Sequence, residues 1–538
     1  MKTCNFLIFF FLGINLQKFV NSTFTQATDE KYCVENIEKD ENVLLERIRD
    51  AKDWALTNGL TFPVPRRKLK CDACDKINEN IVLDDMAQIV PFTLYPSPFP
   101  RELFHQAMDV NKTLLLMYFR ASLPHNFEFL KELHKSVLTV SPSLRSTADL
   151  IERKHKEGIR QPLMLICIRT DYMASEEIDE KSNEKKYALK QIELNGGSIG
   201  GYGTPQPLTA LHRRMLSNVG IDNSTSVMPE NQTTEMLATA MYRAWQEFGD
   251  PKAVILFLHP KLRIFLLVEA RAIQHAMERI FEGKPKPKCV FLTLEEGIDR
   301  LKLNSDNSLI LDGKFTVAVS MARNAAHDAN EAGMEVWKAL KRSTSIHVFN
   351  TLFMLAQSKK VQQALSKPGV VEHFFKMPEE AHLAAEVRKV MPKSWSIGAD
   401  EEEADEIIRM VKANPDNFVM KWNEVTPLKR GSKNVYFDDE IIEKLNSMEE
   451  KERDSFFIME KLRPMVVKNH FVRVHDKPLL NVDVNIELGV HGCLLGNIVD
   501  GTVIDDFWPE NTLKTKLASE NEGGIIKGHS VVDTPYLV

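Results

Sequence analysis

An acid and an amide stand two residues apart near the middle of the chain, directly before a glycine-rich turn. Glu193 and Asn195 lie in a run with the pattern of a strand, and Gly196-Gly-Ser-Ile-Gly-Gly201 follows. Residues i and i+2 of a strand point to the same face, so the two side chains present neighbouring oxygen ligands. Two hard oxygens suit Mg²⁺, and the backbone N–H groups of the turn suit an anionic substrate. This is the chemistry of a nucleotide-driven ligase, although the segment alone also fits a polar edge strand.

Further motifs place this segment in a wider pattern. It resembles the metal-binding strand of eukaryotic glutathione synthetases, which are ATP-grasp enzymes, and the resemblance covers residues 86–538. Each motif is short, but all follow in the order typical of that family. They are Pro91-Phe-Thr-Leu-Tyr-Pro-Ser-Pro98, Arg169-Thr-Asp-Tyr-Met173, Lys359-Lys-Val-Gln-Gln363, Ile458-Met-Glu-Lys-Leu462, Glu487-Leu-Gly489, Gly523-Gly524 and Asp533-Thr-Pro-Tyr-Leu-Val538.

The resemblance implies an α/β chain with the ATP-grasp fold. The ATP-grasp domain would comprise residues 86–251 and 359–538, and residues 252–358 would form an inserted parallel-sheet substrate-binding domain. Apolar runs within the insertion alternate with helical periodicity, as in 269–281, and this βαβ rhythm indicates a mostly parallel sheet. The strands predicted there are 253–259, 288–293, 309–311 and 315–319.

The resemblance also implies ATP as a co-substrate and Mg²⁺ as its metal. Lys359 and Lys421 would face the phosphates, and Met459–Leu462 would be the hinge that meets adenine through its backbone. Catalysis in such a site is mostly positioning and charge stabilisation. A lysine is by default a solvated surface charge, so the shared order of the motifs carries this interpretation. The implied ATP positions are Met173, Glu193, Lys359, Lys421, Asn434, Tyr436, Met459, Glu460, Lys461, Leu462, Glu487, Lys516 and Glu522.

The loop that covers the phosphates departs from the family pattern. Between Lys421 and Tyr436 only Gly431 remains as a glycine, and Pro427 stiffens the loop. Glu424 is the nearest acid and the candidate third metal ligand beside Glu193 and Asn195, although that position could equally be empty. Three cations of the loop could hold phosphates by charge instead of by backbone N–H groups. They are Lys429, Arg430 and Lys433.

The acceptor side departs further. Enzymes of this family activate γ-glutamylcysteine as an acyl phosphate, which the amine of glycine attacks. Here Gly200 stands at a serine position, apolar residues fill most of a polar cluster expected between Lys261 and Arg271, and no tyrosine follows Arg323. The implied catalytic residues are Arg169 and Lys514, the latter at an arginine position. The implied substrate-binding residues are Arg169, Gly197, Ser198, Ile199, Gly200, Arg323, Lys514, Ile525 and Ile526.

The nucleotide residues persist while the acceptor contacts change, which favours an altered substrate over simple decay. The expected function is an ATP-dependent ligase, a homodimer as the family is. It would join a γ-glutamylcysteine-type acceptor to glycine or another amine through an acyl phosphate. The alternative is a secreted, effector-like binding protein with an altered substrate or little ordinary activity.

The amino terminus predicts secretion. Residues 1–22 combine a short basic region, the apolar run Phe6–Ile14 and small residues before Thr23, which is the pattern of a cleaved signal peptide. An uncleaved anchor or a wrong start codon is the alternative. The net charge of −6, with no basic block, argues against nucleic acid or an anionic membrane as the main partner.

Residues 23–85 form an extension that contains three cysteines. We expect Cys33 to form a local disulfide with Cys71 or Cys74, because secretion favours disulfides. The Cys71-Asp-Ala-Cys74 spacing also occurs in redox and zinc sites, but a βαβ setting and a second ligand pair are missing. Three Asn-X-Ser/Thr sequons that begin after the leader agree with a secretory route. They begin at Asn111, Asn223 and Asn231.

Overall fold

The computed structural model describes most of the chain. The described residues are 32–63, 87–178, 183–196, 199–259, 264–323, 329–348, 350–398, 403–423, 433–473, 477–525 and 528–538. The expected leader and most of the cysteine-containing extension lie outside these ranges. No helix within them is both long and apolar enough to cross a bilayer.

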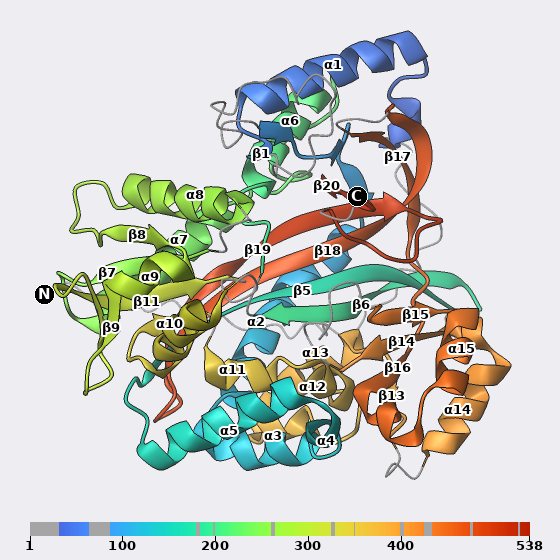
Figure 1. Cartoon of the computed structure of the whole chain (residues 1–538). Helices are drawn as coiled ribbons and strands as arrows, with labels where there is room; N and C mark the ends of the chain where they lie inside the picture. The colour runs from blue at the N-terminus through green and yellow to red at the C-terminus, as the bar shows by residue number, and fades with distance from the viewer. Residues whose placement is uncertain are drawn as a thin grey trace, which may run out of the picture.

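A seven-stranded sheet runs through the centre of the molecule, in the order β17-β3-β20-β19-β18-β5-β6 (Figure 1). All neighbours are antiparallel except β20 and β3. The long strands β18, β19 and β5 carry most of the pairing. The bounds are Phe92–Thr93 for β3, Leu163–Ile178 for β5, Lys185–Gly196 for β6, Val466–Val472 for β17, Leu479–Asn497 for β18, Val503–Leu517 for β19 and Ser530–Asp533 for β20.

Helices cover one face of this sheet. The long helix α2 (Arg101–Ala121) lies against it, and small residues allow the close approach. A Cβ atom at Gly496 would lie 2.4 Å from the ring of Phe119, so only glycine fits there. The layer continues with α3 (Phe127–Leu133), α4 (Val137–Val140), α5 (Pro142–Glu157), α11 (Thr351–Ala356), α12 (Lys359–Ala364) and α13 (Ala381–Val390).

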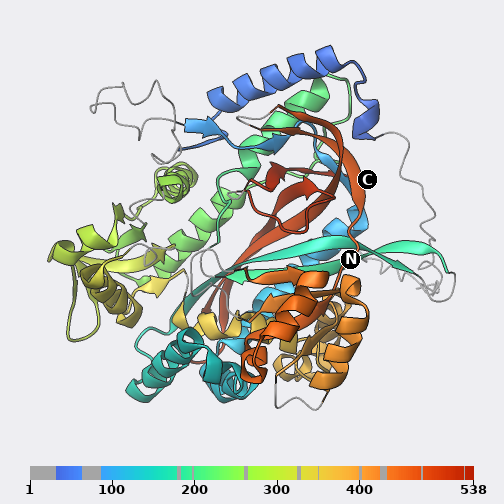
Figure 2. The ribbon, with the colours of Figure 1, turned by 45° about the vertical axis from the view of Figure 1, so that its right-hand side comes forward.

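A four-stranded antiparallel sheet with the order β13-β16-β14-β15 lies beside the large sheet. Its strands are β13 (Ser394–Ser396), β14 (Phe418–Trp422), β15 (Val435–Phe437) and β16 (Phe456–Glu460). Two amphipathic helices, α14 (Ala404–Ala413) and α15 (Asp439–Ser447), bury apolar residues against it. Figure 2 shows this orange unit at one end of the molecule and a third, yellow-green sheet at the other.

The third sheet lies within residues 254–347 and has the order β8-β7-β11-β10-β9, with β12 beside β11. β7 (Val254–Leu258), β8 (Cys289–Leu292), β11 (Phe315–Ala322) and β12 (Ile346–His347) are parallel, as predicted. β9 (Leu301–Leu303) and β10 (Leu309–Leu311) are antiparallel, so the expectation was wrong at this edge. Asp312 and Gly313 both have positive φ and form the tight turn of a β10–β11 hairpin. The neighbouring helices are α7 (Thr233–Phe248), α8 (Ile264–Ile280), α9 (Leu294–Arg300) and α10 (Glu331–Arg342).

The amino-terminal helix α1 (Glu41–Thr57) begins at Asp40, whose side chain accepts from the backbone N–H groups of Asn42 and Val43. It packs on α6 (Pro205–Ser217) with a core that contains Leu44 and Ile48. Short pairings join the extension and the chain end to this core. β1 (Thr61–Pro63) pairs with β2 (Ala87–Ile89), and β4 (Ser97–Phe99) pairs with β21 (Pro535–Leu537).

Two of the three sequon asparagines are buried in the fold. Asn111 is fully buried in α2 and accepts a hydrogen bond from Thr170, and Asn231 donates to the Asn511 carbonyl at 2.6 Å. Asn223 is half-buried and donates to the Arg213 carbonyl. The folded chain therefore presents neither Asn111 nor Asn231 for glycosylation.

Candidate active site

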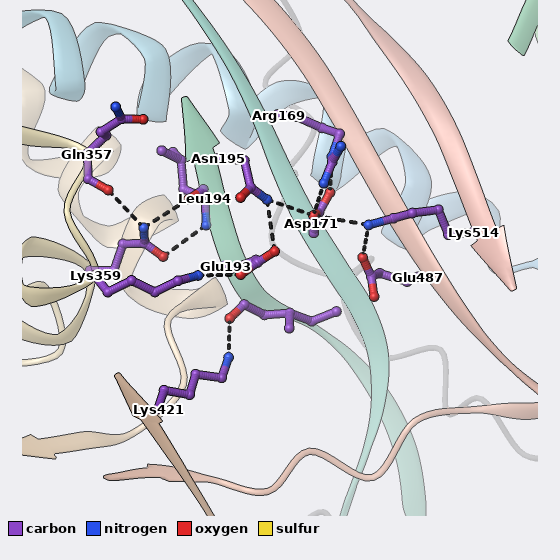
Figure 3. A network of polar contacts seen from close by, with 12 residues as sticks. Arg169, Asp171, Glu193, Leu194, Asn195, Gln357, Lys359, Lys421, Glu487 and Lys514 are labelled. Atoms are coloured by element: carbon purple, nitrogen blue, oxygen red, sulfur yellow. Dashed lines mark hydrogen bonds and ion pairs between the residues drawn. The ribbon is translucent and has the colours of Figure 1, made fainter. Parts of the chain in front are cut away.

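Charged side chains gather on the face of the large sheet that α2 does not cover. On β5, Arg169 and Asp171 flank Thr170, and β6 places Asn195 and Glu193 directly opposite them. On the other side, β18 places His491 opposite Arg169, and Glu487 lies farther along the same strand. Because alternate residues of a strand share a face, these side chains all point the same way. The close-up in Figure 3 shows Arg169, Asp171, Glu193, Asn195 and Glu487 converging.

Asp171 is the centre of this array. Its carboxylate accepts from Arg169 through Nε and Nη2, both at 2.7 Å, from Asn195 Nδ2 at 3.0 Å and from Lys514 Nζ at 3.2 Å (Figure 3). Burial alone would raise the pKa of Asp171, but Arg169 and Lys514 outweigh it and lower that pKa. Lys514 also pairs with Glu487. Asp171 is therefore a buried, ionised carboxylate that holds two cations in place.

Gly489 makes this arrangement possible. It lies opposite Asp171 on β18, and a Cβ atom there would lie 2.9 Å from Asp171 Oδ1 and 3.1 Å from Arg169 Cδ. Any side chain would displace the Arg169–Asp171 pair. This steric constraint explains why a glycine stands at the last position of the Glu487-Leu-Gly489 motif.

A second group of contacts forms beside Glu193. Lys359, the first residue of α12, pairs with its carboxylate, and Asn195 Nδ2 donates to it at 2.9 Å. Burial would raise the pKa of Glu193, but Lys359 and Lys421 outweigh burial and hold it well below its usual range. The two expected metal ligands and the two expected phosphate lysines are therefore brought together.

A β-bulge positions Lys421. The register of β5 and β6 shifts after the Asp171–Glu193 pair, which leaves Ile192 out of the ladder. The Ile192 carbonyl accepts from Lys421 Nζ at 2.9 Å, so the lysine reaches from β14 of the smaller sheet onto the edge of the large one. Burial and the nearby Lys359 lower the pKa of Lys421 to about 8.

The donor set fits Mg²⁺ in part. Glu193 supplies an ionised carboxylate and Asn195 an amide beside it, which suits a metal that takes one or two protein carboxylates. Within the described residues, no group of three or more His, Cys, Asp or Glu side chains could hold a metal. The third expected ligand, Glu424, lies outside those residues.

The other expected nucleotide positions line the junction of the two sheets. Met459 and Glu460 end β16, where Glu460 Oε1 accepts from the Lys393 N–H at 2.8 Å, and Leu462 follows shortly after. Lys461 Nζ pairs with Asp438 at 2.6 Å. Tyr436 lies on β15 just after Asn434, whose carbonyl accepts from the Trp422 N–H. Met173 is on β5, and Lys516, on β19, donates to the Asn521 carbonyl near Glu522.

On the acceptor side, Arg323 at the end of β11 is buried and pairs with Glu269 of α8. Glu269 Oε1 also accepts from the Gly201 N–H at 2.7 Å. A Cβ atom at Gly200 would lie 3.5 Å from Arg323 Nη2, so the lost serine would have touched this arginine. Ile199 is buried, and Ile525 packs against the amino-terminal core. Gly197, Ser198 and Ile526 lie outside the described residues.

Sequence reasoning missed four polar residues of this region. They are Asp171, Glu269, Tyr202 and His491. Asp171 lies inside the motif Arg169-Thr-Asp-Tyr-Met173, and Glu269 lies in the segment between Lys261 and Arg271, where the family resemblance implies a polar cluster. Both residues therefore had a signal in the sequence. Tyr202 and His491 had none.

Tyr202 and His491 are buried and face each other, with ring centroids 4.9 Å apart. Within the described residues, the Tyr202 hydroxyl, both His491 ring nitrogens, and Nε and Nη1 of Arg323 have no hydrogen-bond partner. Burial and the Arg169 cation lower the pKa of His491 to about 3, so the imidazole is neutral. These free polar atoms can meet a polar ligand.

Two further cysteines meet on this face. Cys167 and Cys493 lie opposite each other in the register of β5 and β18, with sulfur atoms 2.9 Å apart, and both are free thiols. Cys33 is also free. Its expected partners Cys71 and Cys74 lie outside the described residues, so that disulfide stays a prediction.

Comparison with known proteins gives the class and then the family. A family model described as the ATP-binding domain of eukaryotic glutathione synthase matches residues 41–537. The class is thus that of ATP-dependent ligases. The chain belongs to the eukaryotic glutathione synthase family.

Relatives agree with this assignment over nearly full length. Human glutathione synthetase is 28% identical over 93% of this chain and 98% of its own length. The Xenopus laevis enzyme is 28% identical over 84% of this chain and 91% of its own. A solved glutathione synthetase-like effector from Globodera pallida, in its apo form, is 42% identical with a TM-score of 0.74. The match covers 94% of this chain and all of that one.

Proposed function

We propose that the protein is a Mg²⁺- and ATP-dependent ligase of the ATP-grasp type that joins a γ-glutamyl thiol peptide to an amine. One observation carries the proposal. Glu193, with Lys359 and Lys421 beside it, and the cations Arg169 and Lys514 are neighbours on one sheet face. Asn195 contacts both Glu193 and Asp171, and Asp171 holds the two cations. A phosphoryl donor and a carboxylate acceptor held on these two groups would be neighbours.

The balanced reaction has two steps. A substrate carboxylate oxygen attacks the γ-phosphorus of ATP, ADP leaves, and an acyl phosphate forms. An amine nitrogen then attacks the acyl carbon, phosphate leaves, and the nitrogen loses a proton. Both steps gather negative charge on phosphate oxygens, which fixed cations stabilise.

On the nucleotide side, Lys359 and Lys421 neutralise phosphate charge, and the backbone of Met459–Leu462 meets adenine. Glu193 and Asn195 would hold Mg²⁺, which supplies charge neutralisation of the phosphates when bound. Lys359 pairs with Glu193 in the ligand-free chain. Phosphate binding therefore requires this lysine to exchange one anion for another.

On the acceptor side, Arg169 gives Nε and Nη2 to Asp171, which leaves Nη1 for a substrate carboxylate. Arg323 contacts Glu269 through Nη2, and its Nε and Nη1 have no hydrogen-bond partner in the part of the chain that the structure describes. Lys514 supplies a charge but lacks the planar fork of arginine. The site therefore retains cations that can bind substrate carboxylates. It has fewer hydrogen-bonding partners for a peptide substrate than the family pattern implies.

A second candidate is an exported binding protein with little ordinary ligase activity. The observation that favours it is the likeness to the Globodera pallida effector, together with the changed acceptor contacts. We propose secretion through the 1–22 leader in either case. We also propose a homodimer, as in the family. Extracellular ATP is scarce, so a ligase exported in this way would act after delivery into another cell.

The deciding experiment measures ADP release by the purified mature chain with Mg²⁺-ATP. The panel comprises γ-glutamylcysteine, other γ-glutamyl peptides and unrelated thiol peptides, each with glycine and with other amines. Acceptor-dependent ADP release supports the ligase and identifies its acceptor. Stabilisation by Mg²⁺-ATP without turnover on any acceptor favours the binding protein. Neither stabilisation nor turnover contradicts both.

A further inference from the structure

A cavity on another part of the molecule has four basic residues in its lining. Its volume is about 70 Å³, and it lies between α5, the segment after α10 and the turn that follows β18. None of the active-site residues described above lines it. Its charged lining comprises four basic residues and one acid: Arg153, Lys154, Arg160, Arg342 and Glu157.

Two amines near this cavity are withdrawn from water: Lys154, which lines it beside Glu157, and Lys341, which lines a smaller neighbouring cavity. Lys154 is half-buried, and burial together with the charge of Lys341 lowers its pKa to about 8. Burial also lowers the pKa of Lys341, whose amine lies 5.0 Å from the centre of the Trp337 ring. Within the part of the chain that the structure describes, neither amine forms an ion pair. The pKa of Lys154 stays lowered although Glu157 attracts the amine, so the fold holds positive charge here that a ligand could balance.

A buried histidine points to the same conclusion independently. His347 on β12 lines this cavity and a smaller neighbouring one of about 20 Å³. Its Nδ1 lies 2.6 Å from the Ser320 hydroxyl, while Nε2 is buried with no partner among the described residues. Burial lowers the pKa of His347 to about 3, so the ring is neutral. When the hydroxyl donates to Nδ1, Nε2 carries the proton and remains a buried donor in the wall of the cavity, close to the Leu340 backbone.

We propose that this cavity is a second anion site, which binds an oxyanion of the phosphate class, either free or as the terminal group of a larger molecule. An arginine guanidinium can donate two parallel hydrogen bonds to two phosphate oxygens, and a lysine ammonium supplies a point charge. The cavity has room for several water-sized groups and is too small for a whole drug-sized ligand. A phosphate group therefore fits inside, and any remainder would lie over the exposed Arg153 and Arg160.

The site joins two parts of the fold. Lys154 comes from the helical layer over the large sheet, and Arg342 and His347 come from the third sheet and its helix α10. An anion held by both sides would stabilise their contact. Occupation should raise the melting temperature of the whole chain.

Isothermal titration calorimetry and thermal unfolding with inorganic phosphate test the proposal, at constant ionic strength set with chloride. Pyrophosphate and citrate are titrated in separate experiments for comparison with phosphate. We expect phosphate to bind and stabilise, and Lys154→Met and Arg342→Ala each to weaken binding about tenfold or more. Tighter binding of pyrophosphate than of phosphate indicates the terminal group of a larger ligand, and equal binding indicates the free ion. Citrate binding as tight as phosphate binding overturns the phosphate class.

Lys156→Ala is the matched control, because Lys156 lies two residues along the same helix, is exposed and pairs with Glu152. It should change phosphate binding less than twofold. An equal loss in Lys156→Ala and Lys154→Met would show diffuse surface charge and refute the site. Lys154→Met should also raise the melting temperature without phosphate, because it removes a half-buried charge whose desolvation cost exceeds the attraction of Glu157. A large fall would show that Lys154 is structural and overturn the proposal.

The active site contains phosphate-facing lysines, so the two sites must be separated. Glu193→Gln should lose stabilisation by Mg²⁺-ATP and keep that by inorganic phosphate. Lys154→Met should show the reverse pattern. Loss of both effects in either variant would place phosphate in the active site and refute a second site.

Discussion

Arg169 and Asp171 stand two residues apart on β5 and form a two-pronged ion pair, with Nε to Oδ1 and Nη2 to Oδ2 both at 2.7 Å. The same carboxylate accepts from Asn195 on one side and from Lys514 on the other. The pair thus links the expected metal strand to the expected acceptor cations. Its integrity bears on both stability and binding.

Asp171→Asn should lower the free energy of unfolding by about 3 to 5 kcal/mol, the usual cost of removing one partner of a buried ion pair. Two buried cations would then lack their carboxylate. Urea denaturation at pH 7 measures the change. The control is Asp312→Asn, which breaks the exposed pair with Arg300 and should have little effect. Equal stabilities of wild type and Asp171→Asn would contradict the role of Asp171.

The lowered pKa of the Asp171 carboxylate predicts part of the loss of folding stability in acid. Its pKa is lowered in the folded state, so it binds protons more weakly there than in the unfolded chain. Its stabilising contribution is therefore complete above the unfolded pKa of about 3.9 and is lost as pH falls through the folded value. Urea midpoints measured from pH 6 down to pH 3 should fall less steeply in Asp171→Asn than in wild type.

Glu193→Gln and Lys421→Ala should each remove most of the stabilisation by Mg²⁺-ATP. At a ligand concentration of 100 times Kd, the wild type should gain about 2.7 kcal/mol. Thermal unfolding with and without Mg²⁺-ATP measures the effect. Lys412→Ala is the control, since Lys412 is an exposed lysine of the same unit that contacts Asn446. An unstabilised wild type would refute the nucleotide site.

ATP affinity should fall as pH rises above 8. Lys421, with a pKa of about 8, loses its charge there, while Lys359, Glu193, Glu487 and Asp171 face it. Phosphate binding favours the charged amine, so Kd should rise by up to about tenfold per pH unit, with proton uptake on binding. Calorimetry in buffers of different ionisation enthalpy measures both. Lys421→Arg keeps its charge and should show a flatter profile.

Turnover with γ-glutamylcysteine and glycine should be slow, because several acceptor contacts have changed. Loss of one oxyanion-type donor costs about 10² to 10³ in rate, although such losses need not add. Gly200→Ser places a hydroxyl beside Arg323 and should lower KM for γ-glutamylcysteine. Gly200→Ala, with the same Cβ and no hydroxyl, is the control. A wild-type kcat of about 1 to 10³ per second would show that the substitutions matter little.

Secreted protein should begin near Thr23 and carry no glycan on Asn111 or Asn231. Both asparagine side chains are buried, and only Asn223 is partly accessible. Amino-terminal sequencing and intact mass before and after deglycosylation measure this. An intact Met1 on secreted material would refute leader cleavage. A glycan on Asn111 would show that modification precedes folding there.

Features that lie within one element were predictable from the sequence. Glu193 and Asn195 share a face because a strand alternates its side chains every two residues, and β6 bears this out. The strands at 253–259, 288–293 and 315–319 were visible as apolar runs, and the structure confirms them. The ordered motifs indicated the family, which the family model confirms.

Contacts between elements were decided only by the tertiary structure. The place of Asp171 between Arg169 and Lys514 depends on the register of β5, β18 and β19, which no local spacing encodes. The bulge that frees the Ile192 carbonyl for Lys421 and the pairing of Arg323 with Glu269 likewise join residues far apart in sequence. The sequence therefore determined which side chains can do the chemistry. Long-range strand pairing decided which of them meet, because it alone sets distance, burial and charge environment.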